Sequence, residues 1–327
     1  MVYKDKIYGK FNITEPIILG LIKCRAMQRL KGINQYGYAG AYLSRAKTNR
    51  FEHSLGVSCL LRKYGAPLEE QISGLLHDIS HSAFSHCIEY ALEKKTFGKQ
   101  NHQDDIFEEY IKKTGIPGIF KRYRISLDYI IDDKNFPLKE KSLPDICADR
   151  IDYLLRDALC FKMIGKKRIN YFLNNLEAKN EKWFFKSYQS AKLFAKLFYY
   201  INKKYYTGLP TVLMFASVGN CLKYALNKGY ISKKNLYATD KQVLNKVKKN
   251  IKKDKKLNLL WEKMNKKSKF NSDIKNYNLK IACKSRAIDP LFIKNGKLLR
   301  ISDIDKNWKK IVEKESKPKE YFIKFEK

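Results

Sequence analysis

The sequence lacks the features by which secreted and membrane-spanning proteins are usually recognised. Its longest apolar stretch, residues 209–219, is about half of the ~20 residues that a bilayer span needs. The N-terminal segment MVYKDKIYGK contains no apolar signal core. The seven cysteines are odd in number and include no Cys-x-x-Cys pair, which argues against a disulfide framework and against a thiolate zinc site. We therefore expect a cytoplasmic protein that does not enter a membrane.

Acidic residues are scarce relative to basic ones. The chain has 67 Lys and Arg against 33 Asp and Glu, which gives a net charge of +34. Such a field concentrates anions, so we expect a nucleotide, a nucleic acid or another acidic partner. Lys, Asn, Ile and Tyr all have A/T-rich codons and are abundant, so genome composition is an alternative source of surface lysines. The charge therefore predicts tolerance of anions and does not identify a reaction.

The remaining composition is that of a folded, mostly helical protein. Hydrophobic residues make up 44% of the 327 residues, and 22 Tyr and 18 Phe exclude wholesale disorder. Apolar residues recur at helical spacing in five segments: 14–33, 51–61, 67–79, 142–159 and 239–251. Alternation of apolar and polar residues predicts strands over 279–284 and 321–325.

The composition shifts towards lysine from about residue 232. We place a boundary near residue 230, between a core over 1–230 and a Lys-rich α+β region over 231–327. The motifs that carry chemistry all lie within residues 28–160 of the core. We therefore expect a mostly α fold with a small α+β appendage at its C-terminal end.

Histidine clustering is the strongest chemical signal in the chain. All five histidines lie between His53 and His102, and two of them flank a carboxylate at the end of a predicted helix, in the order His77, Asp78 and His81. Imidazole and carboxylate ligands without thiolate favour an open, hydrolytic site for a divalent first-row metal. His77 and Asp78 can share one ion only near a helix end, and we expect further ligands from other elements. Such ligands do not distinguish Mn, Fe, Mg, Ni and Zn.

A divalent ion of this kind matches the hydrolysis of phosphate esters, because it lowers the pKa of bound water and polarises a phosphoryl oxygen. His81 and His86 follow the His-Asp pair in a Ser-rich segment. They either bind phosphate oxygens and protonate a leaving group, or serve only to support and cap other groups. His102 with an acid such as Glu89 forms a candidate general-base pair.

Three segments together resemble the H…HD…D signature of the HD-domain phosphohydrolases. They are 49–57 (NRFEHSLGV), 74–86 (GLLHDISHSAFSH) and 149–157 (DRIDYLLRD). Within that superfamily the likeness is closest to the deoxynucleoside triphosphate triphosphohydrolase branch, and it extends over roughly residues 1–160. The resemblance implies an HD-domain helical core and one bound divalent metal ion.

The resemblance also implies a role for individual residues. The implied metal ligands are His53, His77, Asp78 and Asp149. The implied catalytic histidine and its carboxylate are His102 and Glu89. The implied phosphate contacts are Arg50, His81, His86 and Arg150. The implied contacts to the deoxyribose are Gln35, Tyr153 and Asp157.

The resemblance implies that water attacks the α-phosphorus of a dNTP, so that deoxynucleoside and triphosphate leave. The family pattern is not kept in the later helix, where only Val-Gly-Asn at 218–220 remains, so base selectivity is not predicted. Two alternatives stay open. One is an HD phosphohydrolase for other nucleotides (monophosphate, cyclic or signalling) or for nucleic-acid ends. The other is a basic nucleic-acid-binding protein. Many members of the family are oligomers, so a homo-oligomer is also a possible state.

Overall fold

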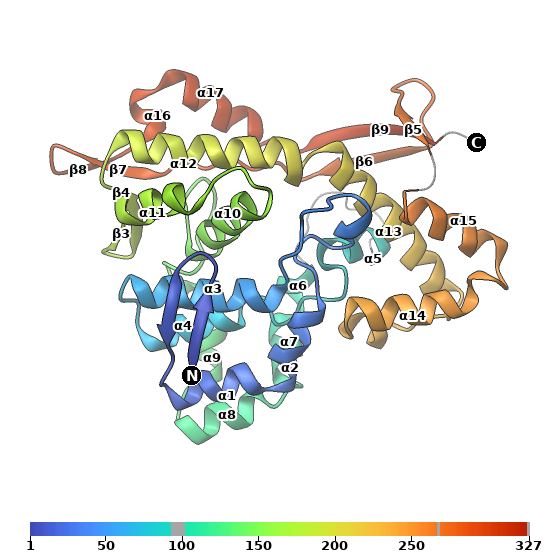
Figure 1. Cartoon of the computed structure of the whole chain (residues 1–327), viewed down its shortest axis with the longest axis horizontal. Helices are drawn as coiled ribbons and strands as arrows, with labels where there is room; N and C mark the ends of the chain where they lie inside the picture. Colours follow the sequence, from blue (N-terminus) through green and yellow to red (C-terminus); the bar gives the residue numbers. More distant parts are fainter. Residues whose placement is uncertain (93–101, 267–268, 326–327) are drawn as a thin grey trace.

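The computed structural model describes residues 1–92, 102–266 and 269–325, and its helices make up most of the fold, as the sequence predicts (Figure 1). Two helices replace the one predicted over 14–33: α1 (Pro16–Lys23) and α2 (Arg25–Arg29). Cys24 separates them because its backbone is extended, with ψ at 148°. A hairpin of β1 (Val2–Asp5) and β2 (Gly9–Asn12), which the helical patterns did not predict, precedes α1.

The centre of the fold is a pair of packed helices, α3 (Arg50–Lys63) and α4 (Leu68–Leu76). Asn49 caps α3, its side chain accepting a hydrogen bond from the backbone N–H of Glu52. Helix α4 begins directly after Pro67, as predicted, and ends at His77. The chain therefore leaves α4 at the His-Asp pair.

Helix α10 (Ala148–Cys160) crosses α3 at close range. It begins later than the predicted residue 142, because the guanidinium of Arg150 donates hydrogen bonds to the carbonyls of Lys141 and Asp145 and holds the preceding segment outside the helix. Gly56 faces α10, and a Cβ built there would lie 1.9 Å from Arg156 Nη2. Only glycine lets the two helices approach this closely.

Helices α12 (Tyr188–Ile201) and α13 (Leu209–Asn227) follow in the second half of the chain. Within the described residues, α13 is the one helix long and apolar enough to cross a membrane by length and composition, but 67% of its apolar window is buried inside the fold. Gly219 of α13 lies against Tyr90, so the segment around α5 (Glu89–Leu92) packs directly on this helix.

The other α-helices lie around these elements, some on the side of α3 and α4 and some on the side of α12 and α13 (Figure 1). They are α6 (His102–Asp105), α7 (Phe107–Lys112), α8 (Ile116–Tyr123), α9 (Leu127–Ile131), α11 (Lys166–Asn175), α14 (Asp240–Ile251), α15 (Lys255–Met264), α16 (Ile301–Ile304) and α17 (Lys306–Glu315). The predicted helix over 239–251 is confirmed by α14.

Both predicted C-terminal strands are present. They are β6 (Leu279–Cys283) and β9 (Lys319–Phe325), which pair antiparallel, and β5 (Phe270–Ser272) adds to the other edge of β9. A second sheet was not predicted. It consists of β3 (Leu176–Lys179), β4 (Lys182–Phe185), β7 (Leu291–Lys294) and β8 (Lys297–Arg300), in that order.

The predicted boundary near residue 230 is crossed by packing and by strand pairing. Strand β4 from the first part pairs in parallel with β7 from the second. One buried core contains Phe185 and Phe198 together with Phe292 and Trp308. The Lys-rich region is therefore packed into the same globule as the helical core.

Candidate metal centre and active site

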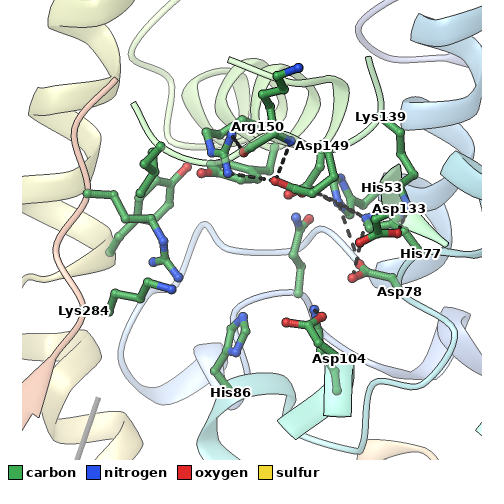
Figure 2. A pocket seen from close by; sticks show the side chains of 18 of the residues that line it. His53, His77, Asp78, His86, Asp104, Asp133, Lys139, Asp149, Arg150 and Lys284 are labelled. Atoms are coloured by element: carbon green, nitrogen blue, oxygen red, sulfur yellow. Dashed lines mark hydrogen bonds and ion pairs between the residues drawn. The ribbon is translucent and has the colours of Figure 1, made fainter. Parts of the chain in front are cut away.

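Four predicted ligands converge from three segments of the chain: His53 in the first turn of α3, His77 and Asp78 directly after α4, and Asp149 at the start of α10 (Figure 2). His53 Nε2 lies 2.8 Å from Asp149 Oδ1 and 3.1 Å from His77 Nε2. Asp78 Oδ1 lies 3.5 Å from His77 Nε2, and its Oδ2 lies 3.8 Å from His53 Nε2. The four side chains thus face one common point.

The tautomers of the two histidines fit a metal ion at that point. The carbonyl of Gly74 lies 2.7 Å from His77 Nδ1, and because a carbonyl can only accept, that nitrogen carries the proton. Asp152 Oδ2 lies 2.7 Å from His53 Nδ1 and acts on it in the same way. Each Nε2 is then the ring nitrogen left for a metal ion, and the two nitrogens face each other and Asp149. A cation between them satisfies all three groups, so the residues present fit a divalent metal.

The field at the cluster also favours a cation. Burial alone would lower the pKa of His53, but hydrogen bonds to Asp149 and Asp152 raise it to about 10. Burial likewise opposes ionisation of Asp149, yet the bonds from His53 and His77 hold its pKa well below the ordinary value. The carboxylates therefore attract positive charge, and a metal ion would take the place of the shared proton.

Arg50 holds Asp78 in place, and His81 lies beside the same carboxylate. Arg50 Nη1 donates to Asp78 Oδ2 at 2.7 Å, and Arg50 Nε donates to Ser85 Oγ at 3.0 Å. His81 Nε2 lies 3.2 Å from Asp78 Oδ1, and burial followed by the charge of Arg50 lowers the pKa of His81 well below its usual range. The side chain of His81 does not line the cavity that opens from the metal ligands, and its Nε2 makes no hydrogen bond among the described residues. The predicted phosphate contact of His81 stays a prediction.

The ligand cluster opens into a cavity of about 1020 Å³, which is large enough for a nucleotide. Ten of the predicted site residues line it: Gln35, Arg50, His53, His77, Asp78, His86, Asp149, Arg150, Tyr153 and Asp157. These residues come from segments up to about 120 positions apart. The structure therefore brings most of the predicted site into one cavity.

The predicted pairing of His102 with Glu89 is wrong. Glu89 Oε1 lies 2.9 Å from His86 Nδ1, three residues earlier on the same turn, whereas His102 Nε2 lies 3.2 Å from the hydroxyl of Tyr237. His86 lines the cavity, and His102 is not among the described residues that do so. The histidine that is paired with the carboxylate of Glu89 is thus His86 and not His102. The catalytic role of His102 stays a prediction.

Arg150 is held by the protein rather than left open to solvent. Besides its two carbonyl partners, it donates to Glu140 Oε1 at 2.9 Å and contacts Cys147 Sγ at 3.1 Å. Glu140, Cys147 and Asp149 also lie close enough to hold an ion. Because the guanidinium bridges two of them, this second group is an ion pair with Arg150 and not a second metal site.

One end of the cavity is aromatic and holds a buried carboxyl group. Tyr206 donates to Asp157 Oδ2 at 2.6 Å. The hydroxyl of Tyr36, which also lines the cavity, lies close enough to act on the same carboxyl group, although Asp157 Oδ1 makes no well-formed hydrogen bond among the described residues. Burial raises the pKa of Asp157 to about 7. The ring of Tyr153 lies between this carboxyl group and the metal ligands. Its centroid is 5.6 Å from the ring centroid of Tyr206 and 6.5 Å from that of His53. This end can accept a hydroxyl-bearing group.

Several residues of the site were not predicted from the sequence: Asp152, Asp104, Tyr206, Lys284 and Arg286. Asp152 had a signal, because it lies one helical turn after Asp149 on the same face. Lys284 and Arg286 had only the alternation that continues from β6. No local pattern connects either of them to metal ligands that lie more than 100 residues earlier in the chain.

Comparisons with known proteins agree with this geometry. Residues 50–157 match the HD domain family. The chain is 32% identical over 314 residues to the uncharacterized protein YdhJ of Bacillus subtilis, covering 96% of this chain and 95% of YdhJ. It is 37% identical over 178 residues to the metal-dependent phosphohydrolase cns2 of Cordyceps militaris, covering 54% of this chain and 51% of cns2.

Likeness to the triphosphohydrolase branch is more distant. The mouse deoxynucleoside triphosphate triphosphohydrolase SAMHD1 is 30% identical over 142 residues, which are 37% of this chain and 21% of that enzyme.

The crystal structure of a hypothetical protein from Aquifex aeolicus shares the fold, with a TM-score of 0.75 at 20% identity over 99% of this chain and 96% of the other. The ligand geometry, the family match and the full-length relative agree, and this chain belongs to the HD-domain superfamily of metal-dependent phosphohydrolases.

Proposed function

We propose that this chain hydrolyses a nucleotide, and that a dNTP, cleaved to deoxynucleoside and triphosphate, is its substrate. The observation that carries the proposal is the single cavity that joins the metal ligands to a buried carboxyl group among tyrosines. A nucleotide can use both ends of this cavity, because its phosphate must reach the metal ion while its sugar presents hydroxyl groups to polar acceptors. The distant likeness to a triphosphohydrolase supports the same substrate class.

His53, His77, Asp78 and Asp149 would hold the divalent ion, which when bound supplies Lewis acidity and a hydroxide nucleophile. Around them the chain's own groups act by positioning. Arg50 holds Asp78 in place through its 2.7 Å hydrogen bond. The phosphate of the substrate then meets ligands whose orientation is already set.

His86 is the group that the proposal assigns to proton transfer. Glu89 Oε1 accepts a hydrogen bond from Nδ1–H of His86, which leaves Nε2 of this cavity-lining residue for proton transfer. Figure 2 shows His86 and Asp104 on the side of the cavity facing Asp149. An imidazole there, when it carries a proton on both nitrogens, can give the Nε2 proton to the oxygen that leaves the phosphorus and return to the neutral form.

Asp157 and Tyr206 would bind the sugar. Asp157 Oδ1 is buried and makes no well-formed hydrogen bond within the described residues, so a substrate hydroxyl that donates to it, in place of the nearby hydroxyl of Tyr36, would satisfy this acceptor. Tyr153 would pack beside the ring of the sugar.

A second candidate substrate is a nucleoside monophosphate. The donors of Arg50 and Arg150 are largely used by carboxylates and carbonyls of the chain, which leaves fewer guanidinium groups for a chain of three phosphates. This reading predicts inorganic phosphate as the product instead of triphosphate.

Product identification separates the two. The purified full chain with Mn²⁺ is incubated with each dNTP, with ribonucleoside triphosphates and with monophosphates, and the products are resolved by chromatography. We expect deoxynucleoside and tripolyphosphate from dNTPs. Asp149→Asn should be inactive, and Asp289→Asn, a buried carboxylate that is bonded to Ser302 outside the cavity, is the matched control. Release of neither deoxynucleoside nor tripolyphosphate would refute the dNTP assignment.

A further inference from the structure

The segment that follows β6 places two cations on the cavity wall. Side chains of an extended chain point alternately to opposite sides. Cys283, Ser285 and Ala287 are buried in the protein, while Lys284 and Arg286 between them are partly exposed and line the cavity. The C-terminal region therefore contributes directly to the site.

This segment is anchored from behind. Ser285 Oγ donates to Glu315 Oε2 at 2.6 Å and accepts from Asn202 Nδ2 at 3.0 Å. Glu315 is itself paired with Lys319 at 2.7 Å. Because the residue between the two cations is buried and held by two elements, both cations face the cavity from a fixed backbone.

The two cations stand apart from the metal ligands. Figure 2 shows Lys284 across the cavity from His53, His77 and Asp78. Burial, followed by the neighbouring charge of Arg286, lowers the pKa of Lys284, and the more distant carboxylates of Asp104 and Glu89 offset this only in part. Like charges gathered on a partly buried wall repel one another, and a bound anion would relieve that repulsion.

We infer that Lys284 and Arg286 bind an anionic group of the substrate that lies away from the phosphate held at the metal. The inference rests on the proposed function and extends it, because it requires a substrate with two separated anionic positions, as in a polyphosphate chain. The metal ligands engage the phosphate that is cleaved, and the cation pair engages the far end of the chain. The Lys-rich C-terminal region thus contributes to substrate selection.

Equilibrium binding tests the inference without turnover. Inorganic tripolyphosphate and orthophosphate are titrated calorimetrically into the full-length protein with its metal. We expect tripolyphosphate to bind more tightly than orthophosphate, and Lys284→Gln and Arg286→Gln each to weaken tripolyphosphate about 10-fold or more, the effect of losing a charged hydrogen bond. Lys284→Arg should keep most of the affinity, because it keeps the charge.

Lys294→Gln, an exposed lysine on β7 outside the cavity, is the matched control and should bind like the wild type. The inference is overturned if the wild type shows no preference for tripolyphosphate, or if the two Gln variants bind tripolyphosphate unchanged. It is also overturned if they lose orthophosphate and tripolyphosphate equally, which would indicate a general structural effect.

Kinetics separate this inference from the proposed function. With a dNTP substrate we expect the two Gln variants to raise KM about 10-fold while kcat changes by less than about 3-fold. If no nucleotide is hydrolysed by the wild type, the proposed function fails, and the binding experiment still decides whether the cation pair is an anion site.

Discussion

A substitution at the contact between helices α3 and α10 tests how the protein supports the metal ligands. Gly56 lies on α3, and a Cβ at this position would lie 1.9 Å from Arg156 Nη2 and 2.2 Å from Asp152 Oδ1. Those two atoms form a buried ion pair at 2.7 Å, and Arg156 also reaches Asp5 at 3.1 Å. The substitution Gly56→Ala therefore forces a fully packed, charged pair to move.

The expected magnitude comes from opposing effects. In an ordinary helix interior, replacing Gly with Ala stabilises by about 1 kcal/mol. Against this, overpacking costs about 1–3 kcal/mol, and breaking a buried ion pair costs about 3–5 kcal/mol. Because the clashing atoms are the ends of side chains, we expect the pair to be displaced rather than broken completely, and Gly56→Ala to lower the free energy of unfolding by about 2–4 kcal/mol.

The same substitution should weaken metal binding. Asp152 Oδ2 accepts the hydrogen bond of His53 Nδ1 at 2.7 Å, so displacing Asp152 rotates or releases a metal ligand. Loss of such support lowers metal affinity by about 10–100-fold. Urea unfolding followed by circular dichroism measures the stability, and competition with a chelator measures the metal affinity.

Gly20→Ala is the matched control. It is the same substitution inside helix α1, where the new Cβ would lie 3.7 Å from Ile119 Cγ2, an ordinary contact. We expect this variant to be as stable as the wild type or more stable, with normal metal binding. If Gly56→Ala is as stable as Gly20→Ala and binds metal normally, the reasoning about the α3–α10 contact is refuted.

Four further predictions concern single side chains of the site. Asp152→Asn should lower metal affinity about 10–100-fold, because an amide holds the imidazole of the ligand less strongly than a carboxylate does; chelator competition measures it. His77→Ala should remove bound metal and hydrolysis together, as seen by elemental analysis beside the product assay. Burial raises the pKa of Asp157 to about 7, so the folded state holds a proton that the unfolded state releases above about pH 4. The free energy of unfolding should therefore fall, by up to about 4 kcal/mol, as the pH rises from about 4 to 7, and urea unfolding should show that Asp157→Asn removes this slope. His86→Ala should keep the metal and slow turnover by roughly 10²-fold, more than His102→Ala does.

Asp289→Asn is the control for both aspartate variants, since Asp289 is buried and bonded to Ser302 away from the cavity. It should leave metal affinity and turnover unchanged. Normal metal affinity in Asp152→Asn, or metal retained by His77→Ala, would contradict the ligand arrangement. If the free energy of unfolding of Asp157→Asn still falls between pH 4 and 7, groups other than Asp157 cause the pH dependence.

The elements that could be predicted are those with a local signal. Helices α4 and α14 and strands β6 and β9 lie where periodicity and start signals place them, because these patterns reflect which face of a short segment is buried. The break at Cys24 and the pairing of β4 with β7 could not be predicted, since they depend on partners that are distant in sequence.

The site divides in the same way. Sequence alone determined which side chains can bind a metal ion. A His-Asp pair at a helix end and a cluster of histidines with no Cys-x-x-Cys pair indicate metal binding through the types and spacing of the residues. Only the tertiary structure decided the partners. Glu89 supports His86 because the turn between them is tight, and Lys284 reaches the cavity because β6 packs beside α13. Ligand identity is a property of the residue, whereas support and charge balance arise from distances between segments that only packing brings together.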